Sequence, residues 1–105
     1  APNENAFRKY DVILKYVKEV VKNELVLIAL GATATILSYD LACSGFWAVD
    51  IGHLDLEYEW YCSSAKERHK IPYKYVNEIY RGDQVRGLPE HMREKYEKEI
   101  IVNLA

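Results

Sequence analysis

The stretch that decides the fold is Leu25–Glu59, which reads LVLIALGATATILSYDLACSGFWAVDIGHLDLEYE. Its first part, Leu25–Leu30, is almost continuously apolar and stops at a glycine, Gly31. A second apolar run, Phe46–Ile51, is short, aromatic and β-branched, and it stops at Gly52. Both runs therefore have the composition of buried β-strands that end in a glycine turn.

A helical pattern separates the two runs. It covers Thr33 to Cys43, and Ser44-Gly45 supplies its end, since glycine is the usual left-handed cap. The order strand, helix, strand predicts two parallel strands joined by one crossover helix. Both glycine turns then emerge at the carboxyl edge of the sheet, where open α/β sheets bind ligands.

The flanking regions extend this prediction. We expect a helix over Asn3–Asn23 that Asn3 or Asn5 caps, and a helical turn over Asp55–Tyr61. Residues 63–84 look irregular, with a short extended piece at Tyr73–Val76, and a last helix is expected over Glu90–Leu104. The predicted fold class is α/β: a Rossmann-like partial parallel sheet flanked by helices.

Length and composition set limits on function. The chain has 105 residues, which predicts one domain, and it is 50% hydrophobic, which is enough for a core. Its net charge of −2 argues against nucleic acid as a partner. The longest apolar run, Leu25–Leu37, is shorter than the ~20 residues that span a bilayer.

Cys43 and Cys62 fit a reducing cytoplasm better than a disulfide scaffold. The start at Ala1-Pro2, without methionine, raises the expectation of processing or of a missing upstream half.

The first glycine turn is a candidate phosphate site. In Gly31-Ala32-Thr33-Ala34-Thr35 the glycine lets backbone approach a phosphate, the helix start offers free amides, and the threonines add hydroxyl donors. The turn is neither a dinucleotide G-x-G-x-x-G motif nor a P-loop. The alternative interpretation is a tight strand-to-helix turn capped by Thr33.

The second turn leads into acidic residues. Asp55 and Glu57 form a D-x-E pair, whose side chains converge on one Mg²⁺ or Mn²⁺ in an extended segment. On a helix they would be about 200° apart and would not chelate together. A general base that deprotonates an incoming hydroxyl is the other role open to either carboxylate.

Histidine and aromatic residues add further candidates. His53 suits proton transfer or donation to a diphosphate oxygen, or else it is satisfied by local backbone. His69 and His91 lack metal-ligand spacing to it, which disfavours zinc. Three aromatic residues follow the acids, and core packing is a better interpretation for them than stacking on a base or sugar: Tyr58, Trp60 and Tyr61. Basic residues further on are expected to be mostly solvated, with one or two meeting an anionic ligand: Lys66, Arg68, Lys70, Lys74 and Arg81.

Three segments taken together carry a family resemblance: PNENAFRKYDVIL, the long block LVLIALGATATILSYDLACSGFWAVDIGHLDLEYEW, and KIPYKYVNE. They resemble the C-terminal half of the bacterial GT-D-type glycosyltransferases, formerly a domain of unknown function, DUF1792. The resemblance implies a Rossmann-like enzyme that transfers a hexose such as glucose from a UDP-sugar to a glycan or glycoprotein acceptor, with a divalent cation (Mn²⁺ or Mg²⁺).

The resemblance also assigns residues by position. Gly31, Thr33 and Ala34 match the glycine turn that would hold the nucleotide diphosphate, and Ala32 stands where the family usually has proline. The acidic block lining the cleft matches Asp50, Gly52, His53, Asp55, Glu57 and Glu59. The downstream V-N-E matches Asn77 and Glu78. The upstream half of full members, with its own D-x-E, has no counterpart here.

Two functional hypotheses follow. In the first, the chain is a glycosyltransferase or a C-terminal fragment of one. Under this hypothesis, Gly31–Thr35 holds the diphosphate, and His53 helps to stabilise the charge that develops on the leaving phosphate. Asp55 or Glu57 serves as the general base or as an auxiliary metal ligand. In the second, it is a non-catalytic nucleotide-binding or dimerisation module, which pairs through exposed apolar sheet with a second copy or the missing N-terminal half. A Rossmann-type oxidoreductase is weaker, since the dinucleotide glycine pattern is missing.

Overall fold

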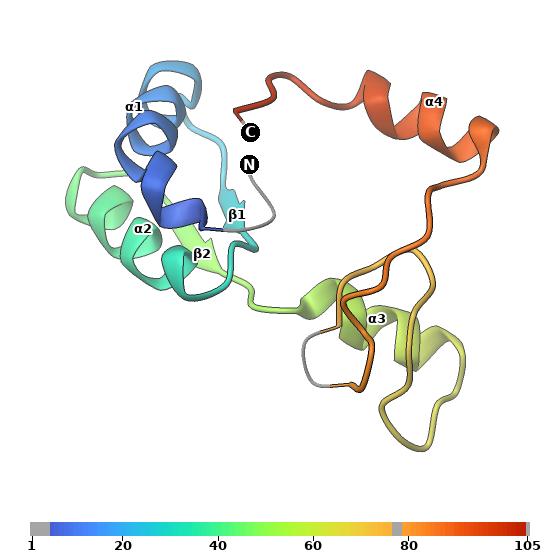
Figure 1. Cartoon of the computed structure of the whole chain (residues 1–105). Coiled ribbons are helices and arrows are strands. Elements are labelled where there is room, and N and C mark those ends of the chain that lie inside the picture. The colour runs from blue at the N-terminus through green and yellow to red at the C-terminus, as the bar shows by residue number, and fades with distance from the viewer. Residues whose placement is uncertain (1–4, 77–78, 105) are drawn as a thin grey trace. The chain divides into compact units, whose positions relative to one another are not determined.

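The computed structural model describes residues 5–76 and 79–104. The chain forms two compact units, one made of residues 5–52 with 102–104, the other of His53–Ile101 (Figure 1). Compact units of this kind also occur within one domain, so the expectation of a single α/β domain stays a prediction.

The first unit contains the predicted strand, helix and strand. The strands pair in parallel, with Val26 opposite Ala48 and Ile28 opposite Asp50. The prediction of two parallel strands joined by a crossover helix is therefore confirmed. The elements of this unit, in chain order, are a 3₁₀ turn η1 (Ala6–Lys9), α1 (Tyr10–Val20), β1 (Val26–Ile28), α2 (Ala32–Cys43) and β2 (Ala48–Asp50).

The N-terminal helix is shorter than the apolar periodicity predicts. It ends at Val20, because Val21 is extended, with φ −80° and ψ 132°. At its other end Asn5 is left-handed and makes no side-chain capping bond, so the expected cap at this residue is wrong. Asn3, the other expected cap, lies outside the described residues.

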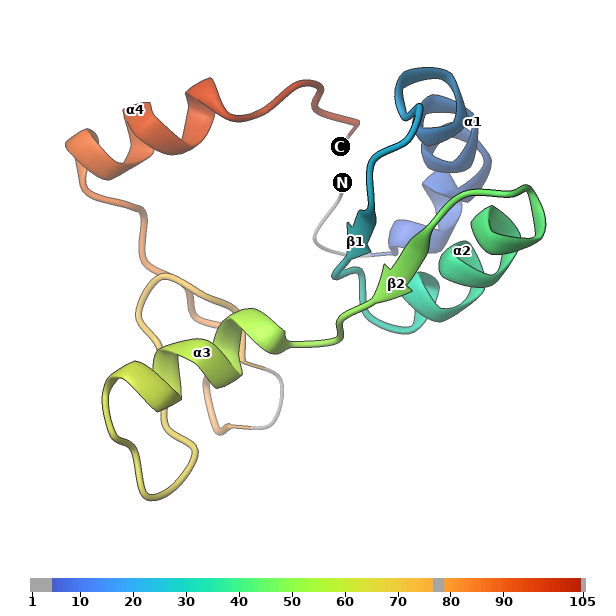
Figure 2. The ribbon, with the colours of Figure 1, turned by 180° about the vertical axis from the view of Figure 1, so that it is seen from behind.

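Both helices of the first unit cover the same face of the two-stranded sheet (Figures 1 and 2). Alternate strand residues turn toward them, since successive side chains of a strand point to opposite faces. The buried cluster between helices and sheet consists of Ile13, Ile28, Ala34, Leu37 and Leu41, with Val26, Ala48 and Leu104 among the half-buried residues around it.

The other face of this sheet carries exposed apolar side chains. Leu27 and Val49, which lie opposite each other in the register, are 58% and 42% exposed. Next to them, Leu25 and Trp47 are 42% and 69% exposed. Parallel strands are normally covered on both faces. Among residues 5–52 and 102–104, helices cover one face of this sheet and leave the other exposed.

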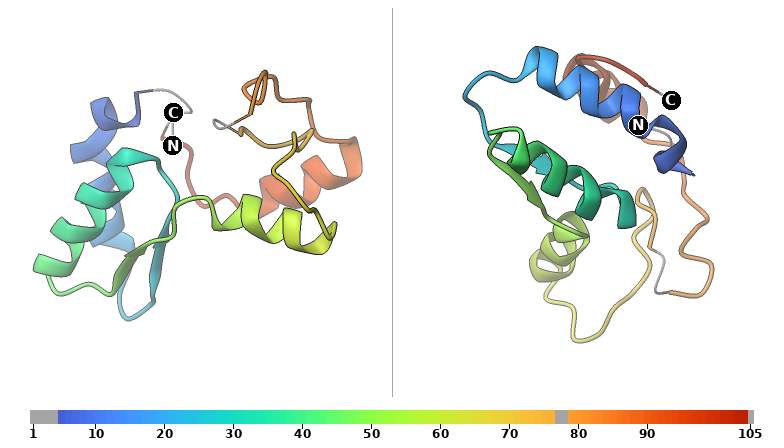
Figure 3. Two further views of the ribbon diagram at one scale, coloured as in Figure 1. Left: turned by 90° about the horizontal axis from the view of Figure 1, so that it is seen from below. Right: turned by 90° about the vertical axis from the view of Figure 1, so that its left-hand side faces the viewer.

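The second unit is built on α3 (Leu54–Cys62), and the loop after the helix folds back along it (Figure 3). Leu56 and Trp60 point into a small core with Ile71 and Val76, and the Trp60 indole N–H donates to the carbonyl of His69 at 2.9 Å. A buried indole needs such a partner, so this bond fixes the returning loop.

Two sequence predictions fail in this unit. Tyr73–Val76 begins in a turn rather than as an extended piece, since the Lys74 amide donates to the Ile71 carbonyl at 3.2 Å. The last helix, α4, covers Glu90–Lys98 and does not reach Leu104. Its final turn is tightened, because the Glu99 amide bonds back to the Tyr96 carbonyl at 3.1 Å.

Two further properties bear on the sequence predictions. Within residues 5–76 and 79–104, no helix has the length and apolar character that crossing a membrane requires. Cys43 and Cys62 are both free thiols at exposed positions.

Candidate functional site

The two glycine bends of the first unit lie side by side. Ile28, the last residue of β1, is opposite Asp50, the last residue of β2. One step further, the Ile51 amide donates to the Ile28 carbonyl at 2.9 Å. Gly31 and Gly52 follow these strand ends, and both have positive φ, 53° and 55°. The sequence prediction that both bends share one sheet edge is therefore confirmed.

The first bend is a sharp entry into α2. Gly31 is the residue before the helix, with φ 53° and ψ −146°, a conformation open almost only to glycine. Its carbonyl accepts the Ala34 amide at 3.0 Å. The amides of Ala32 and Thr33 belong to the first turn, where a helix has no internal acceptor for them.

Thr33 does not cap this helix, as the alternative interpretation of the turn required. No side-chain capping bond is present, and only 8% of the Thr33 surface is exposed. Ala34 is fully buried. The exposed polar parts of the turn are thus backbone and Thr35, which is the arrangement that favours an anion at the helix start.

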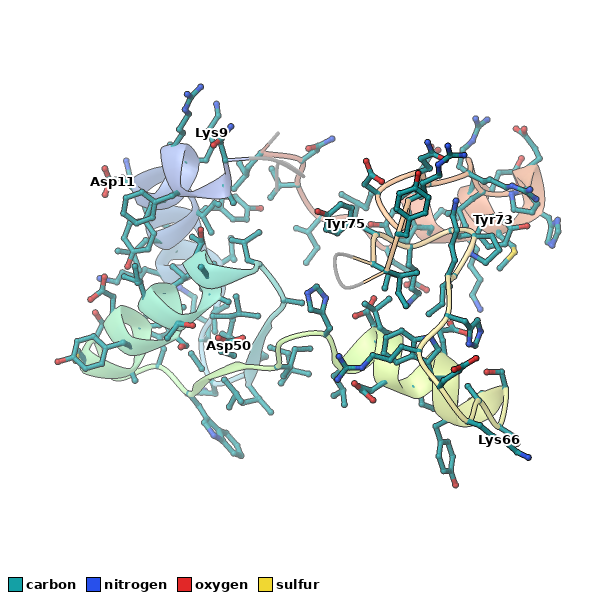
Figure 4. All side chains as sticks on the ribbon, turned by 60° about the horizontal axis from the view of Figure 1, so that its bottom comes forward. Lys9, Asp11, Asp50, Lys66, Tyr73 and Tyr75 are labelled. Atoms are coloured by element: carbon teal, nitrogen blue, oxygen red, sulfur yellow. The ribbon has the colours of Figure 1, made fainter. Side chains whose placement is uncertain are left out.

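Asp50 ties the two bends together. One carboxylate oxygen accepts the Thr35 hydroxyl at 2.9 Å, and the other accepts the Gly52 amide at 2.9 Å. The side chain lies on the helix-covered side of the sheet, within the first unit (Figure 4). The sequence placed Thr35 in the phosphate turn and, by the family resemblance, Asp50 in the acidic block that lines the cleft, as separate groups. The structure shows them as a cross-link that fixes the shape of the edge.

The remaining predicted site residues belong to the second unit. His53 is the residue before α3, and its carbonyl accepts the amides of Leu56 and Glu57 at 3.0 and 3.2 Å. Its imidazole is exposed and makes no capping bond with the helix. Asp55 and Glu57 lie in the first turn of α3, where negative charge is favoured by the helix dipole.

The helical conformation decides between the two interpretations of the D-x-E pair. Residues two apart on an α-helix are separated by about 200°, so Asp55 and Glu57 do not converge on one cation. Among the described residues, no group of three or more His, Cys, Asp and Glu side chains is arranged to hold a metal ion. These carboxylates therefore do not fit a bidentate metal site in this conformation.

Asp55 pairs instead with Glu59, one turn along the same helix face. Lys74 reaches both, with its Nζ 3.2 Å from an Asp55 oxygen and 3.9 Å from a Glu59 oxygen. The ammonium group offsets the repulsion between the two carboxylates. Sequence reasoning had left Lys74 among a set of mostly solvated basic residues. Its position as the second lysine of KIPYK was the signal that could have singled it out.

These three charged residues line a cavity of about 740 Å³ in the second unit. Tyr73, which is labelled in Figure 4, also lines this cavity, together with Met92 and Tyr96 of α4. The other lining residues are apolar: Ile71, Pro72 and Leu88. Glu57 is not among them and lines a smaller hollow of about 180 Å³ with Lys66 and Arg68.

The aromatic residues of α3 divide between core and surface. Trp60 is buried, as the core-packing prediction requires, whereas Tyr58 and Tyr61 are 65% and 81% exposed, so that prediction is wrong for them. A hydrogen bond with the Cys62 thiol raises the pKa of the Tyr58 hydroxyl. Asn77 and Glu78, matched to V-N-E by resemblance, lie outside the described residues.

The parallel strand pair, its crossover helix and the acidic segment after the second bend place the chain in a known class. A family model described as "Glycosyltransferase GT-D fold" matches residues 1–79, which is most of the chain, and the chain belongs to this family.

Individual relatives agree with this membership. The chain is 38% identical, over 111 aligned positions, to the "Probable glycosyl transferase Gly" of Streptococcus gordonii, and it is 29% identical to "Glycosyltransferase GlyD" of Streptococcus pneumoniae serotype 4. These alignments cover 99% and 98% of this chain but only 15% and 12% of the relatives.

Solved structures give the same result. A DUF1792 glycosyltransferase from Streptococcus sanguinis is 36% identical, with a TM-score of 0.83 over the whole of this chain. Another, described as having a distinct glycosyltransferase fold, is 37% identical with a TM-score of 0.77 over 89% of this chain. This chain corresponds to 38% and 34% of those two chains.

Proposed function

We propose that this chain forms the donor-binding part of a glycosyltransferase that transfers a hexose, such as glucose, from a UDP-sugar to a glycan or glycoprotein acceptor. The observation that carries the proposal is the sheet edge at which the Gly31 bend and the Asp50–Gly52 bend lie side by side. Membership of a glycosyltransferase family supports the assignment of this edge to a nucleotide sugar.

The chemistry of the edge suits a diphosphate. The amides at the start of α2, which have no acceptor within the helix, and the positive end of its dipole favour negative charge. Asp50 is itself negative, yet both of its oxygens accept hydrogen bonds from the bends, which lowers the repulsion it exerts on an incoming phosphate. The glycine at position 31 leaves room for close approach, because an added Cβ would meet no atom within 4 Å.

The proposed catalytic roles follow the family motif. His53 assists the charge that develops on the leaving phosphate, and Asp55 accepts the proton of the attacking hydroxyl. Glu57 is the weaker candidate for the base, because it lines the smaller hollow and not the large cavity. A requirement for Mn²⁺ or Mg²⁺ is a separate proposal. It is tested by transfer assays of the enzyme with and without a chelator.

UDP binding tests the donor site, and the chain offers a matched pair of variants. Gly31 and Gly45 stand at the two ends of α2, both with positive φ, and an added Cβ would meet no atom within 4 Å at either position. Gly31→Ala should cost roughly 1–3 kcal/mol in stability, since the conformation of Gly31 is open almost only to glycine, and Gly45→Ala controls for the loss of a positive-φ glycine next to the same helix. Only Gly31→Ala should also reduce the thermal stabilisation of the chain by UDP. Equal thermal stabilisation of the two variants by UDP would show that the donor site does not lie at this bend.

Three broader statements belong to the same proposal. The chain spans 38% and 34% of the two solved relatives, and from the resemblance of its motifs it is proposed to belong to the C-terminal half of a larger, Rossmann-like catalytic domain. Its location is proposed to be cytoplasmic, where nucleotide sugars are available. Nucleic acid is not proposed as a partner, since the net charge is −2.

A second candidate function is supported by the exposed sheet face. Leu25, Leu27, Trp47 and Val49 form an apolar patch where parallel sheets normally carry a covering layer. The chain would then be a non-catalytic module that pairs through this face with a second copy of itself.

Light scattering after size-exclusion chromatography tests this pairing. Leu27→Lys should abolish dimerisation, while Val12→Lys, on the similarly exposed surface of α1, should leave it intact; the two side chains are 58% and 51% exposed. A wild-type chain that is monomeric at every protein concentration would contradict the module.

A further inference from the structure

The large cavity of the second unit has no part in donor binding as proposed above. It has a volume of about 740 Å³, within the ~300–1,000 Å³ typical of small-ligand sites. We infer that this cavity is the subsite for a neutral saccharide of the acceptor. The inference rests on the proposed function, since it names the acceptor of that same transfer reaction.

The apolar and aromatic lining residues suit the apolar face of a pyranose ring. Tyr73 and Tyr96 are 41% and 59% exposed, and Met92 of α4 is 45% exposed, so all three offer surface to a ligand. Aromatic rings bury large flat areas while their hydroxyl groups keep a hydrogen-bond partner. The C–H side of a sugar ring is the matching shape.

The charged residues of the lining suit the hydroxyl groups of a sugar. Asp55 and Glu59 supply acceptors for sugar hydroxyls, and Lys74 supplies donors. The ion pairs restrict the motion of these side chains, which lowers the ordering that binding requires. These three residues carry two carboxylates and one ammonium group. Their net negative charge disfavours anionic ligands such as phosphates and favours a neutral, hydroxylated ligand.

The cavity is lined by residues from both sides of the end of the family match: Tyr73 lies before that end, as the charged residues do. Asp55, Glu59 and Lys74 fall within the residues that match the family model, which ends at residue 79. Leu88, Met92 and Tyr96 come from the segment beyond it. The apolar lining residues, from both segments, would then help to set which saccharide this chain accepts.

Saturation-transfer-difference NMR on the full chain tests the inference with three probes: the methyl β-glycosides of glucose, galactose and N-acetylglucosamine. At least one should receive saturation on its ring C–H protons. Tyr96→Ala should weaken its binding about fivefold, from the loss of one aromatic contact. Tyr96→Phe should keep the binding, which separates a lost ring face from a lost hydroxyl.

Tyr61→Ala is the matched control, since Tyr61 is an exposed tyrosine of α3 that does not line the cavity. Far-UV circular dichroism establishes that each variant is folded. Absence of transfer to all three glycosides, or equal losses in Tyr96→Ala and Tyr61→Ala, would overturn the inference. The donor site is judged separately by the UDP response of Gly31→Ala, which the cavity variants should leave unchanged.

Discussion

The cross-link between the two bends gives the sharpest quantitative prediction. Asp50 accepts one bond from Thr35 and one from the Gly52 amide, each 2.9 Å long. Thr35→Val removes the first bond and keeps a β-branched side chain of the same size on α2. Asp50→Ala removes both. The two variants and their combination form a double-mutant cycle on one contact.

The magnitudes follow from the charge and exposure of the partners. A hydrogen bond to a charged group contributes roughly 1.5–3 kcal/mol, and exposure of Thr35 and Asp50 lowers this to about 1 kcal/mol. Thr35→Val should then destabilise the chain by about 1 kcal/mol and Asp50→Ala by about 2 kcal/mol. The double variant should lose no more than Asp50→Ala alone, which gives a coupling of about 1 kcal/mol.

Urea unfolding followed by circular dichroism measures these free energies, with a common m-value for the four proteins. Ser38→Ala is the control, since it removes a hydroxyl of the same helix that donates to the Thr35 carbonyl at 3.0 Å. If the two single losses simply add in the double variant, Thr35 and Asp50 do not act on each other, and the cross-link is refuted.

Three further outcomes are expected. Tyr10→Phe should cost about 1 kcal/mol, because Tyr10 donates to Asp40. Burial, together with this bond, raises the pKa of Tyr10 to about 12 from its ordinary 10.0, so the stability it adds is full below pH 10 and disappears toward pH 12. Wild-type and variant unfolding free energies should converge over that range, and a constant difference would contradict the argument. Leu41→Ala should cost about 2–4 kcal/mol in urea unfolding, since Leu41 is fully buried. Trp60→Phe should expose the returning loop to faster amide exchange, because the bond to the His69 carbonyl is lost; unchanged exchange would show that the apolar contacts alone hold it.

The parts of the fold that the sequence predicted correctly are those set by local chemistry. Apolar strands, a helix of suitable period and glycines with positive φ at Gly31, Gly45 and Gly52 defined the strand–helix–strand unit. Helix ends were missed where the apolar spacing continued beyond the hydrogen bonds, as in α1 and α4. Apolar periodicity reports burial, and it does not show where backbone bonding stops.

The candidate site was less predictable, because its contacts join residues far apart in the sequence. Thr35 and Asp50 were both candidates, yet their mutual bond depends on the strand register. Lys74 lies 19 positions from Asp55, and no local pattern relates the two. Tyr58 and Tyr61 were expected in the core because aromatic residues often are, but Leu56 and Trp60 occupy the buried side of α3.

The conformation of α3 also changes which acids act together. In an extended segment the D-x-E pair would share a face, but on a helix residues four apart are separated by only about 40°. The acids that face one cavity are therefore Asp55 and Glu59, with Lys74 between them, while Glu57 faces basic residues elsewhere in the same unit. A motif with three alternate acids thus supplies two surfaces. In the proposed acceptor subsite the outer two acids, Asp55 and Glu59, would hold hydroxyl groups, and Glu57 would take no part.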